Sequence, residues 1–151
     1  MRRAHAADLK AVVAWLRETA KVPVWLVGTS RGTQSAASVA TQLAGPDGPD
    51  GLVLTSTILS DDKGRPVPAM PLDKLRIPVL VVHHEHDGCK LCAFADMPSL
   101  MAKLDKAPRK QLLAFKGGTT RGDPCEAFAY HGFNGLESDV VPQIAAWITT
   151  P

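Results

Sequence analysis

Apolar residues recur along this chain with two different periods, and each period predicts its own kind of element. A repeat of three or four residues, with polar side chains on the opposite side, predicts amphipathic helices. Short continuous apolar runs bounded by proline, glycine or charged residues predict buried strands. The predicted helices cover residues 6–20 and, approximately, 34–43, 96–106 and 138–149. The predicted strands cover residues 24–28, 51–55, 77–83 and 110–115.

The same pattern names the side chains that we expect to be buried. The apolar face of the first helix consists of Leu9, Val12, Val13 and Leu16. The apolar face of the last helix consists of Val141, Ile144, Ala145 and Ile148. The tryptophans Trp15, Trp25 and Trp147 are expected in the core, because large aromatic side chains are mostly buried. The strand at 24–28 is apolar throughout, so we expect both of its faces to be covered.

Strands that alternate with helices predict an α/β fold in which about four parallel strands carry helices on both faces. The length of 151 residues suits a single domain over residues 1–151. The loop at 60–75 is polar, rich in proline and too short for a helical cap over a substrate. We therefore expect an open site without a cap domain.

The sequence Gly-Thr-Ser-Arg-Gly joins the first predicted strand to the second predicted helix. Gly-x-Ser-x-Gly at such a turn indicates a nucleophile elbow, which lifts the Ser30 hydroxyl above the edge of the sheet. Crowding of the turn predicts that Gly28 and Gly32 must lack side chains. The Arg31 amide, at the positive end of the helix, is placed to stabilise a negatively charged oxygen. The alternative is a glycine-flanked turn in some other α/β protein.

A serine hydroxyl becomes a nucleophile only beside a base that a carboxylate orients. The carboxyl ends of parallel strands lie at one edge of a sheet, so residues that follow different strands meet there. Asp87 follows the third predicted strand, and His131 lies in the loop after the fourth. Taken singly, Asp87 could be a turn residue and His131 a solvent-facing loop residue. Together with Ser30 they predict a Ser-Asp-His triad.

The elbow and the order Ser, Asp, His resemble the α/β hydrolases of the esterase and lipase type, over nearly the whole chain. The resemblance implies that Ser30 is the nucleophile, His131 the base, Asp87 the orienting carboxylate and the Arg31 amide one oxyanion donor. It implies hydrolysis of a carboxylic ester with a modest acyl group through an acyl-serine intermediate, without metal or cofactor.

The α/β-hydrolase fold has further strands before the helix with which this chain opens, and a loop after one of them supplies a second oxyanion amide. The resemblance is therefore to the C-terminal part of that fold, with the N-terminal strands missing. The strand from Val24 to Gly28 would then expose an apolar edge. We expect a second copy of this chain, or a completing chain, to pair with it.

A narrower resemblance rests on the run His-His-Glu-His-Asp-Gly-Cys around Asp87 and on Pro-Cys-Glu before His131. Both look like a group of bacterial hydrolases made as exported precursors, in which a cysteine after the aspartate pairs with one before the histidine. This implies a Cys89–Cys125 disulfide, although Cys92 leaves a Cys92–Cys125 pair open. It also implies a periplasmic or secreted protein, although the chain itself carries no recognisable signal peptide.

Composition argues against two classes of partner. The formal net charge is +2 and the lysines and arginines are scattered, which is not the footprint of a nucleic-acid-binding protein. No apolar segment approaches the length that spans a membrane. A small ester is therefore the expected partner.

Three other interpretations compete with the esterase. The histidines and cysteines of 83–92 suit zinc, but a structural zinc site draws two close pairs from separate segments, and we find no second pair. The Cys-x-x-Cys spacing of Cys89 and Cys92 is also typical of thiol-disulfide proteins. The third interpretation is a partial domain, which keeps the triad residues but performs no chemistry.

Overall fold

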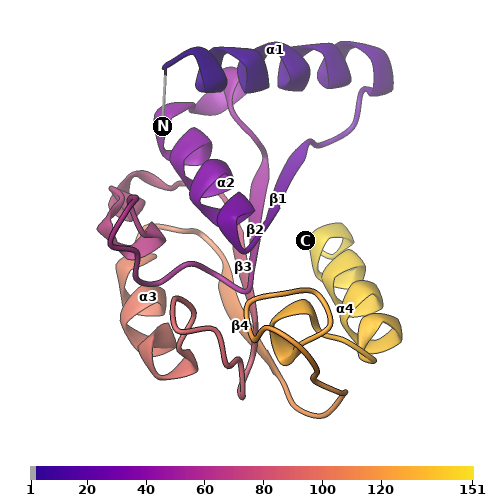
Figure 1. The fold of residues 1–151 in the computed structure, drawn as a ribbon. Helices are drawn as coiled ribbons and strands as arrows, with labels where there is room; N and C mark the ends of the chain where they lie inside the picture. Colours follow the sequence, from indigo (N-terminus) through magenta and orange to yellow (C-terminus); the bar gives the residue numbers. More distant parts are fainter. Residues whose placement is uncertain (1–2) are drawn as a thin grey trace.

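The computed structural model describes residues 3–151. In chain order its helices and strands are α1 (Arg3–Ala20), β1 (Trp25–Thr29), α2 (Arg31–Gln42), β2 (Gly51–Thr55), β3 (Val79–His84), α3 (Met97–Lys103), β4 (Lys110–Phe115) and α4 (Glu137–Thr149). Figure 1 shows strands and helices alternating along the chain, as predicted. None of the helices within 3–151 combines the length and the apolar character needed to cross a membrane.

The four strands form one parallel sheet in the order β1-β2-β3-β4. Neighbouring strands in the sheet are also consecutive strands in the chain. Because all three pairings are parallel, the carboxyl ends of the strands lie at the same edge. The register aligns Gly28 with Leu54, and Leu54 with Val81. This confirms the predicted parallel α/β architecture and brings the loops that follow β1, β3 and β4 to one end of the molecule.

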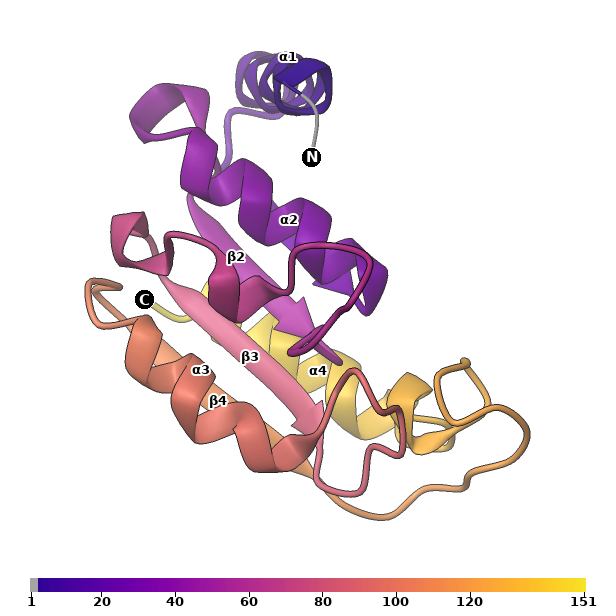
Figure 2. The same ribbon diagram turned by 60° about the vertical axis from the view of Figure 1, so that its left-hand side comes forward.

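Helices cover both faces of the sheet, because successive side chains of a strand point to opposite sides. Leu52 and Leu54 of β2 pack in one core cluster with the alanines of α2 and with α3, whereas Val53 packs in a second cluster with α4. Figure 2 shows α2 and α3 on one side of the strands and α4 on the other. The sheet is therefore held between two apolar layers at β2 and β3.

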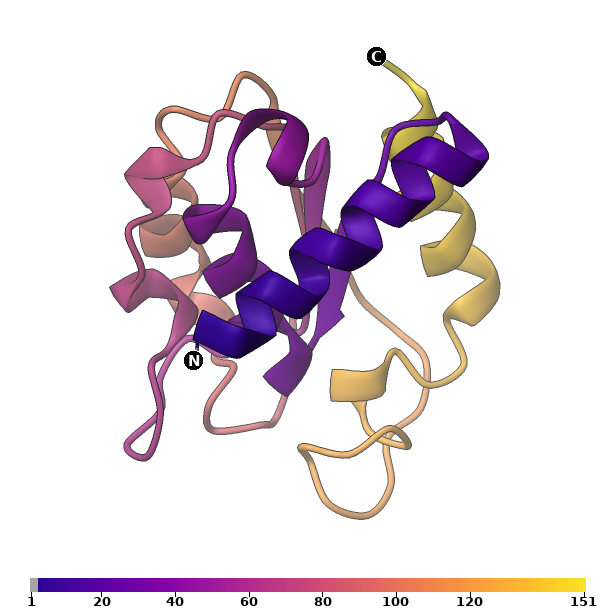
Figure 3. The same cartoon turned by 90° about the horizontal axis from the view of Figure 1, so that it is seen from above.

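Helix α1 packs mainly on α2 and on the turn Gly45–Asp47, and Figure 3 shows it running across the fold. This contact buries a narrow stripe that includes Val13, which is 1% exposed. Val12 and Trp15 are 50% and 62% exposed, so the prediction that they are buried was wrong. The helix meets its neighbours along a single line, and residues on either side of that line face solvent.

The buried face of α4 matches the predicted one in part, because Ile144 and Ile148 pack against the core as predicted. Val140 and Trp147 are buried, while Val141 and Ala145 are exposed, contrary to prediction. Trp147 holds the rotation of the helix, because its Nε1 donates to the Gln111 side chain at 2.8 Å and its ring meets Trp25 edge-on. A tryptophan with a hydrogen-bond partner at the sheet thus outweighs the simple apolar repeat.

Strand β1 forms one edge of the sheet, since it pairs only with β2 in the sheet of the described chain. Its Val27 side chain is 56% exposed and Trp25 is half-buried, so the prediction that both faces are covered was wrong. Helix α2 packs against β1, but the α4 layer, which contacts Trp25, leaves Val27 open to solvent. The chain thus presents an apolar side chain beside an unpaired strand edge.

Candidate active site

Ser30 occupies a strained turn between β1 and α2. Its backbone has φ 52° and ψ −121°, a conformation that residues with a side chain rarely adopt. Three hydrogen bonds hold it there: the Ser30 amide donates to Thr55 O at 3.0 Å, and the Thr33 amide and hydroxyl donate to Ser30 O at 2.8 and 2.6 Å. The turn therefore places the Ser30 side chain at the carboxyl end of the sheet.

The two glycines that flank this turn differ in their steric role. A Cβ on Gly28 would overlap the carbonyl group of Gly32 and lie 2.9 Å from the Ala36 Cβ, so no side chain fits there, as predicted. A Cβ on Gly32 would meet no heavy atom within 4 Å among residues 3–151. The predicted steric requirement at Gly32 was therefore wrong, because this first turn of α2 faces open space.

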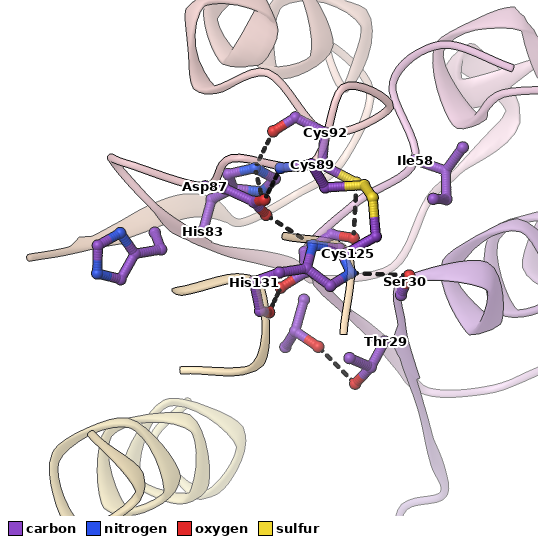
Figure 4. A network of polar contacts seen from close by, with 12 residues as sticks. Thr29, Ser30, Ile58, His83, Asp87, Cys89, Cys92, Cys125 and His131 are labelled. Atoms are coloured by element: carbon purple, nitrogen blue, oxygen red, sulfur yellow. Dashed lines mark hydrogen bonds and ion pairs between the residues drawn. A yellow bond between two sulfur atoms is a disulfide. The ribbon is translucent and has the colours of Figure 1, made fainter. Parts of the chain in front are cut away.

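Ser30, His131 and Asp87 lie in one hydrogen-bonded series (Figure 4). His131 Nε2 is 2.9 Å from Ser30 Oγ, and His131 Nδ1 is 2.8 Å from Asp87 Oδ2. A carboxylate only accepts hydrogen bonds, so the proton of the neutral imidazole sits on Nδ1 and Nε2 is left to accept from the Ser30 hydroxyl. The side chains of His131 and Asp87 are 3% and 0% exposed.

Neighbouring groups hold Asp87 in place. Its Oδ1 accepts from the Cys89 amide at 2.9 Å, and its Oδ2 lies 3.6 Å from His83 Nε2. His83 Nε2 is closer to the Cys92 carbonyl, at 2.7 Å, and donates its proton there. Burial lowers the pKa of His83, so this ring is neutral at neutral pH. Its Nδ1 finds no hydrogen-bond partner within the described chain.

The segment around His131 is held by Ser56 and Tyr130, which sequence reasoning did not single out, and by His84, which it considered only as a zinc ligand. Ser56, which directly follows β2, donates from its hydroxyl to the His131 carbonyl at 2.5 Å. His84 hydrogen-bonds the Gly117 carbonyl through Nε2 at 2.9 Å and stacks on Tyr130 with ring centroids 4.4 Å apart. Their position at strand ends is the one sequence signal that could have identified them.

The Arg31 amide is the first of α2, and the first amides of a helix have no acceptor within the helix. It lies beside Ser30 and is free to meet a negatively charged oxygen. The guanidinium of Arg31 forms an ion pair with Asp61, which also accepts from the Gln34 side chain at 2.9 Å. Hydrogen bonds from Gln34, the Lys63 amide and Arg31 lower the pKa of Asp61 to about 2.

A cavity of about 690 Å³ opens over Ser30 and His131. Its other walls are largely apolar or small: Thr29, Arg31, Ile58, Cys89, Leu91, Cys125, Glu126, Ala127 and Gly132. The cavity can therefore admit a small molecule to the Ser30 hydroxyl.

Cys89 and Cys125 form a disulfide, which confirms the pairing that the resemblance implied and removes the Cys92–Cys125 alternative. Cys92 is a free, fully buried thiol, and burial raises its pKa to about 12. A thiol-disulfide protein needs an exposed thiol of low pKa. The interpretation of Cys89 and Cys92 as a redox pair was therefore wrong for this structure.

The zinc site that we considered over residues 83–92 does not form either. His83 and His84 turn to different backbone carbonyls, Cys92 O and Gly117 O, and Asp87 turns to His131. These side chains do not converge on one point.

No protein-family model and no curated protein sequence matches the chain. Solved structures do. The esterase domain of a Rhodothermus marinus protein aligns with this chain at a TM-score of 0.52 and 18% identity. The alignment includes 75% of this chain and 57% of the esterase domain. A protein of unknown function from Agrobacterium tumefaciens, described provisionally as an α/β hydrolase, covers 95% with 58% of its own, at 15% identity and a TM-score of 0.59.

An acetyl ester-xyloside bifunctional hydrolase from Caldicellulosiruptor lactoaceticus covers 91% of this chain with 61% of its own, at 16% identity and a TM-score of 0.58. Likenesses at this identity show the fold, which is that of the α/β hydrolases. The chain spans 57% to 61% of the length of these three structures. It thus carries the α/β-hydrolase fold in part.

Proposed function

We propose that this chain is a serine hydrolase that cleaves carboxylic esters through an acyl-serine intermediate. The observation that carries the proposal is the unbroken series from Ser30 Oγ to His131 Nε2 and from His131 Nδ1 to Asp87 Oδ2, at 2.9 and 2.8 Å. Such a series lets one imidazole take the serine proton while a buried carboxylate stabilises the resulting positive charge. The hydrolase fold is consistent with this chemistry.

The proposed reaction has two halves. Ser30 Oγ attacks the ester carbonyl as its proton passes to His131 Nε2, and the Arg31 amide donates to the oxyanion that forms. When the tetrahedral species collapses, the alcohol leaves with the proton from His131. A water molecule then gives its proton to the same nitrogen, attacks the acyl carbonyl and releases the acid, and the proton returns to Ser30.

We further propose that the substrate is an ester with a modest acyl group. The cavity over Ser30 is about 690 Å³, and Ile58 and Leu91 supply apolar walls. Two of the similar structures are named as an esterase domain and as a hydrolase of an acetyl ester, which supports the same class of reaction.

The test is hydrolysis of p-nitrophenyl acetate and p-nitrophenyl butyrate by the non-reduced chain. Ser30→Ala removes the nucleophile and should abolish the activity, whereas Ser38→Ala, on the same helix, should leave it unchanged. Labelling by an alkyl fluorophosphonate should follow the same pattern. Equal rates for the chain and for Ser30→Ala would refute the proposed nucleophile.

The second candidate is a partial domain that keeps the triad residues but does not turn over esters without a partner chain, and the open edge at β1 is the observation that favours it. The Arg31 amide is the one oxyanion donor that we assign. A missing donor lowers the rate by about 10²- to 10³-fold. Under this alternative the fluorophosphonate labels Ser30 while ester turnover stays within a few-fold of the Ser30→Ala background.

We also propose that a second copy of this chain, or a completing chain, pairs with the strand edge at residues 24–28. The unpaired edge and the exposed Val27 side chain, 56% accessible, support this. Light scattering at micromolar concentration should then give the mass of a dimer or larger assembly, and a purely monomeric sample would exclude self-association.

The disulfide supports a further proposal, that the chain works in an oxidising compartment such as the periplasm or the exterior of the cell. Alkylation of free thiols immediately on lysis should then modify no more than one of the three cysteines per chain.

A further inference from the structure

Three sulfur atoms and an imidazole gather beside the Ser30 cavity. The sulfurs of Cys89 and Cys92 and a ring nitrogen of His131 all lie within 4.8 Å of one another, and all three residues are buried. The sulfur of Cys125 is bonded to that of Cys89 and so lies next to these three ligand atoms. Figure 4 shows the three cysteines on one side of the His131 ring.

The four residues come from two separate segments as two close pairs. Cys89 and Cys92 form a Cys-x₂-Cys pair after β3, and Cys125 and His131 form a Cys-x₅-His pair after β4. Two such pairs are the usual source of ligands in structural zinc sites. Sequence reasoning recognised the first pair alone, because it assigned Cys125 to a disulfide and His131 to catalysis.

We propose that reduction of the Cys89–Cys125 disulfide converts this cluster into a Cys₃His site for Zn²⁺, and that an ion bound there takes His131 away from Ser30. The reductant is a dithiol: it gives two electrons and two protons to the two sulfurs and is itself oxidised to a disulfide. Zn²⁺ then replaces the three thiol protons, which pass to solvent.

Three of the four ligand atoms need only a small adjustment of their positions. Zn–S bonds of about 2.3 Å in a tetrahedron place ligand atoms about 3.8 Å apart. The ligand atoms of Cys89, Cys92 and His131 must therefore approach one another by about 1 Å from their largest present separation of 4.8 Å, and the Cys125 sulfur must turn in as the fourth ligand. Breaking the disulfide lets the Cys89 and Cys125 sulfurs separate to this same distance. Cys125 is partly exposed and lines the cavity over Ser30, so a reductant can reach it.

Neighbouring groups already hold the ligands. The Cys92 carbonyl accepts from His83 at 2.7 Å, the Cys92 thiol donates to Ser56 O at 3.6 Å, and the Cys89 amide donates to Asp87. Burial disfavours a free thiolate at Cys92, but a bound cation compensates the negative charge and deprotonates a coordinating thiol. The Asp87 carboxylate adds a negative charge that attracts the ion.

The effect on catalysis follows from His131 and rests on the proposed function. If Nε2 binds the metal, it no longer accepts from the Ser30 hydroxyl. If Nδ1 binds, the ring gives up its hydrogen bond to Asp87. In both cases the series Ser30–His131–Asp87 is broken, and the reduced chain loaded with zinc is inactive.

The experiment is a titration of the reduced chain with Co²⁺, a coloured substitute for Zn²⁺. The chain is reduced with dithiothreitol without oxygen, freed of the reductant and titrated. One equivalent of Co²⁺ should produce the intense visible bands of a tetrahedral site and the ultraviolet bands of thiolate ligation, and one equivalent of Zn²⁺ should remove both. The near-ultraviolet circular dichroism should remain that of a folded chain.

Two controls isolate the cluster. The non-reduced chain should give no tetrahedral bands. Reduced Cys92→Ser, which keeps a donor for the Ser56 carbonyl, should bind Co²⁺ at least about tenfold more weakly. The metal site is refuted if reduced and non-reduced chains bind Co²⁺ equally, if Cys92→Ser binds as the parent does, or if binding accompanies unfolding.

Ester hydrolysis tests the second half. Zn²⁺ should inhibit the reduced chain and spare the non-reduced chain and reduced Cys92→Ser, and full activity of the zinc-loaded chain would refute the capture of His131. If no form of the chain hydrolyses esters, the proposed function fails, and the cobalt titration alone decides the metal site.

Discussion

At the scale of single residues, the site depends on which nitrogen of His131 carries the proton. The Asp87 side chain is 0% exposed and accepts two hydrogen bonds, one from the Cys89 amide and one from His131 Nδ1. A buried acceptor of this kind allows one tautomer of the imidazole, the one whose Nε2 faces Ser30 as an acceptor.

Replacing the Asp87 carboxylate by an amide tests its role in setting the tautomer of His131 without changing the size of the side chain. Asp87→Asn keeps the size of the side chain but lets it donate to Nδ1, which favours the wrong tautomer. We expect kcat to fall by about 10⁴-fold with little change in KM, measured with p-nitrophenyl acetate. Asp139→Asn, an equal change on the exposed side of α4, is the control. An undiminished kcat in Asp87→Asn would contradict the proposed role.

His83 makes the stability of the chain depend on pH. Burial lowers its pKa in the folded state below the ordinary value of 6.5, so the unfolded chain takes up the proton first. Stability conferred by the neutral ring is complete above pH 6.5 and is lost as the pH falls towards the folded pKa. We expect the urea midpoint to drop between pH 7 and 5, and to drop less in His83→Gln. His5→Gln is the control, and its urea midpoint should fall over this pH range by as much as that of the parent chain.

At the scale of elements, the β1–α2 turn makes opposite demands on its two glycines. Gly28→Ala forces a Cβ against the Gly32 carbonyl and should lower the free energy of unfolding by about 1 to 3 kcal/mol. Gly32→Ala places a better helix former in open space and should raise it by about 0.5 to 1 kcal/mol. Urea denaturation of the two variants measures the contrast, and a loss of similar size in both would contradict it.

The disulfide joins the loop after β3 to the loop after β4, and these loops carry Asp87 and His131. Replacing Cys89 and Cys125 together by serine should lower the free energy of unfolding by about 2 to 5 kcal/mol. Cys92→Ser removes a thiol without breaking a bond and is the matched control. Thermal unfolding of both variants measures this difference. Equal unfolding midpoints for the double variant and for Cys92→Ser would show that the disulfide does not stabilise the fold.

At the scale of the whole molecule, the sheet ends at β1 with an apolar side chain in solvent. A charge at that position should prevent another strand from pairing there. Val27→Lys should therefore lower the mass measured by light scattering to that of a monomer. Val141→Lys, a matched change at another exposed valine, should leave the mass unchanged. If both variants associate as the parent does, pairing at this edge is excluded.

Much of the architecture could be predicted from the sequence because it follows from local patterns. The strands at 51–55 and 110–115 coincide with β2 and β4, since each holds a short apolar stretch that is bounded by turn residues. The third helix was predicted to reach residue 106 but ends at Lys103. The exposure of Val12, Trp15 and Val141 was missed, because an apolar repeat does not say how much of a helix face a neighbour covers.

The sequence by itself determined the order of strands and helices, the elbow at Ser30 and the positions of Asp87 and His131 after their strands, because short-range pattern and strand direction govern all of these. Tertiary structure decided the distances at which His131 meets Ser30 and Asp87, the choice of Cys89 over Cys92 as the partner of Cys125, and the position of the Cys92 thiol near Cys89 and His131. It also decided which face of β1 stays open. Such distances depend on how loops far apart in the chain pack at one end of the sheet, which no local pattern contains.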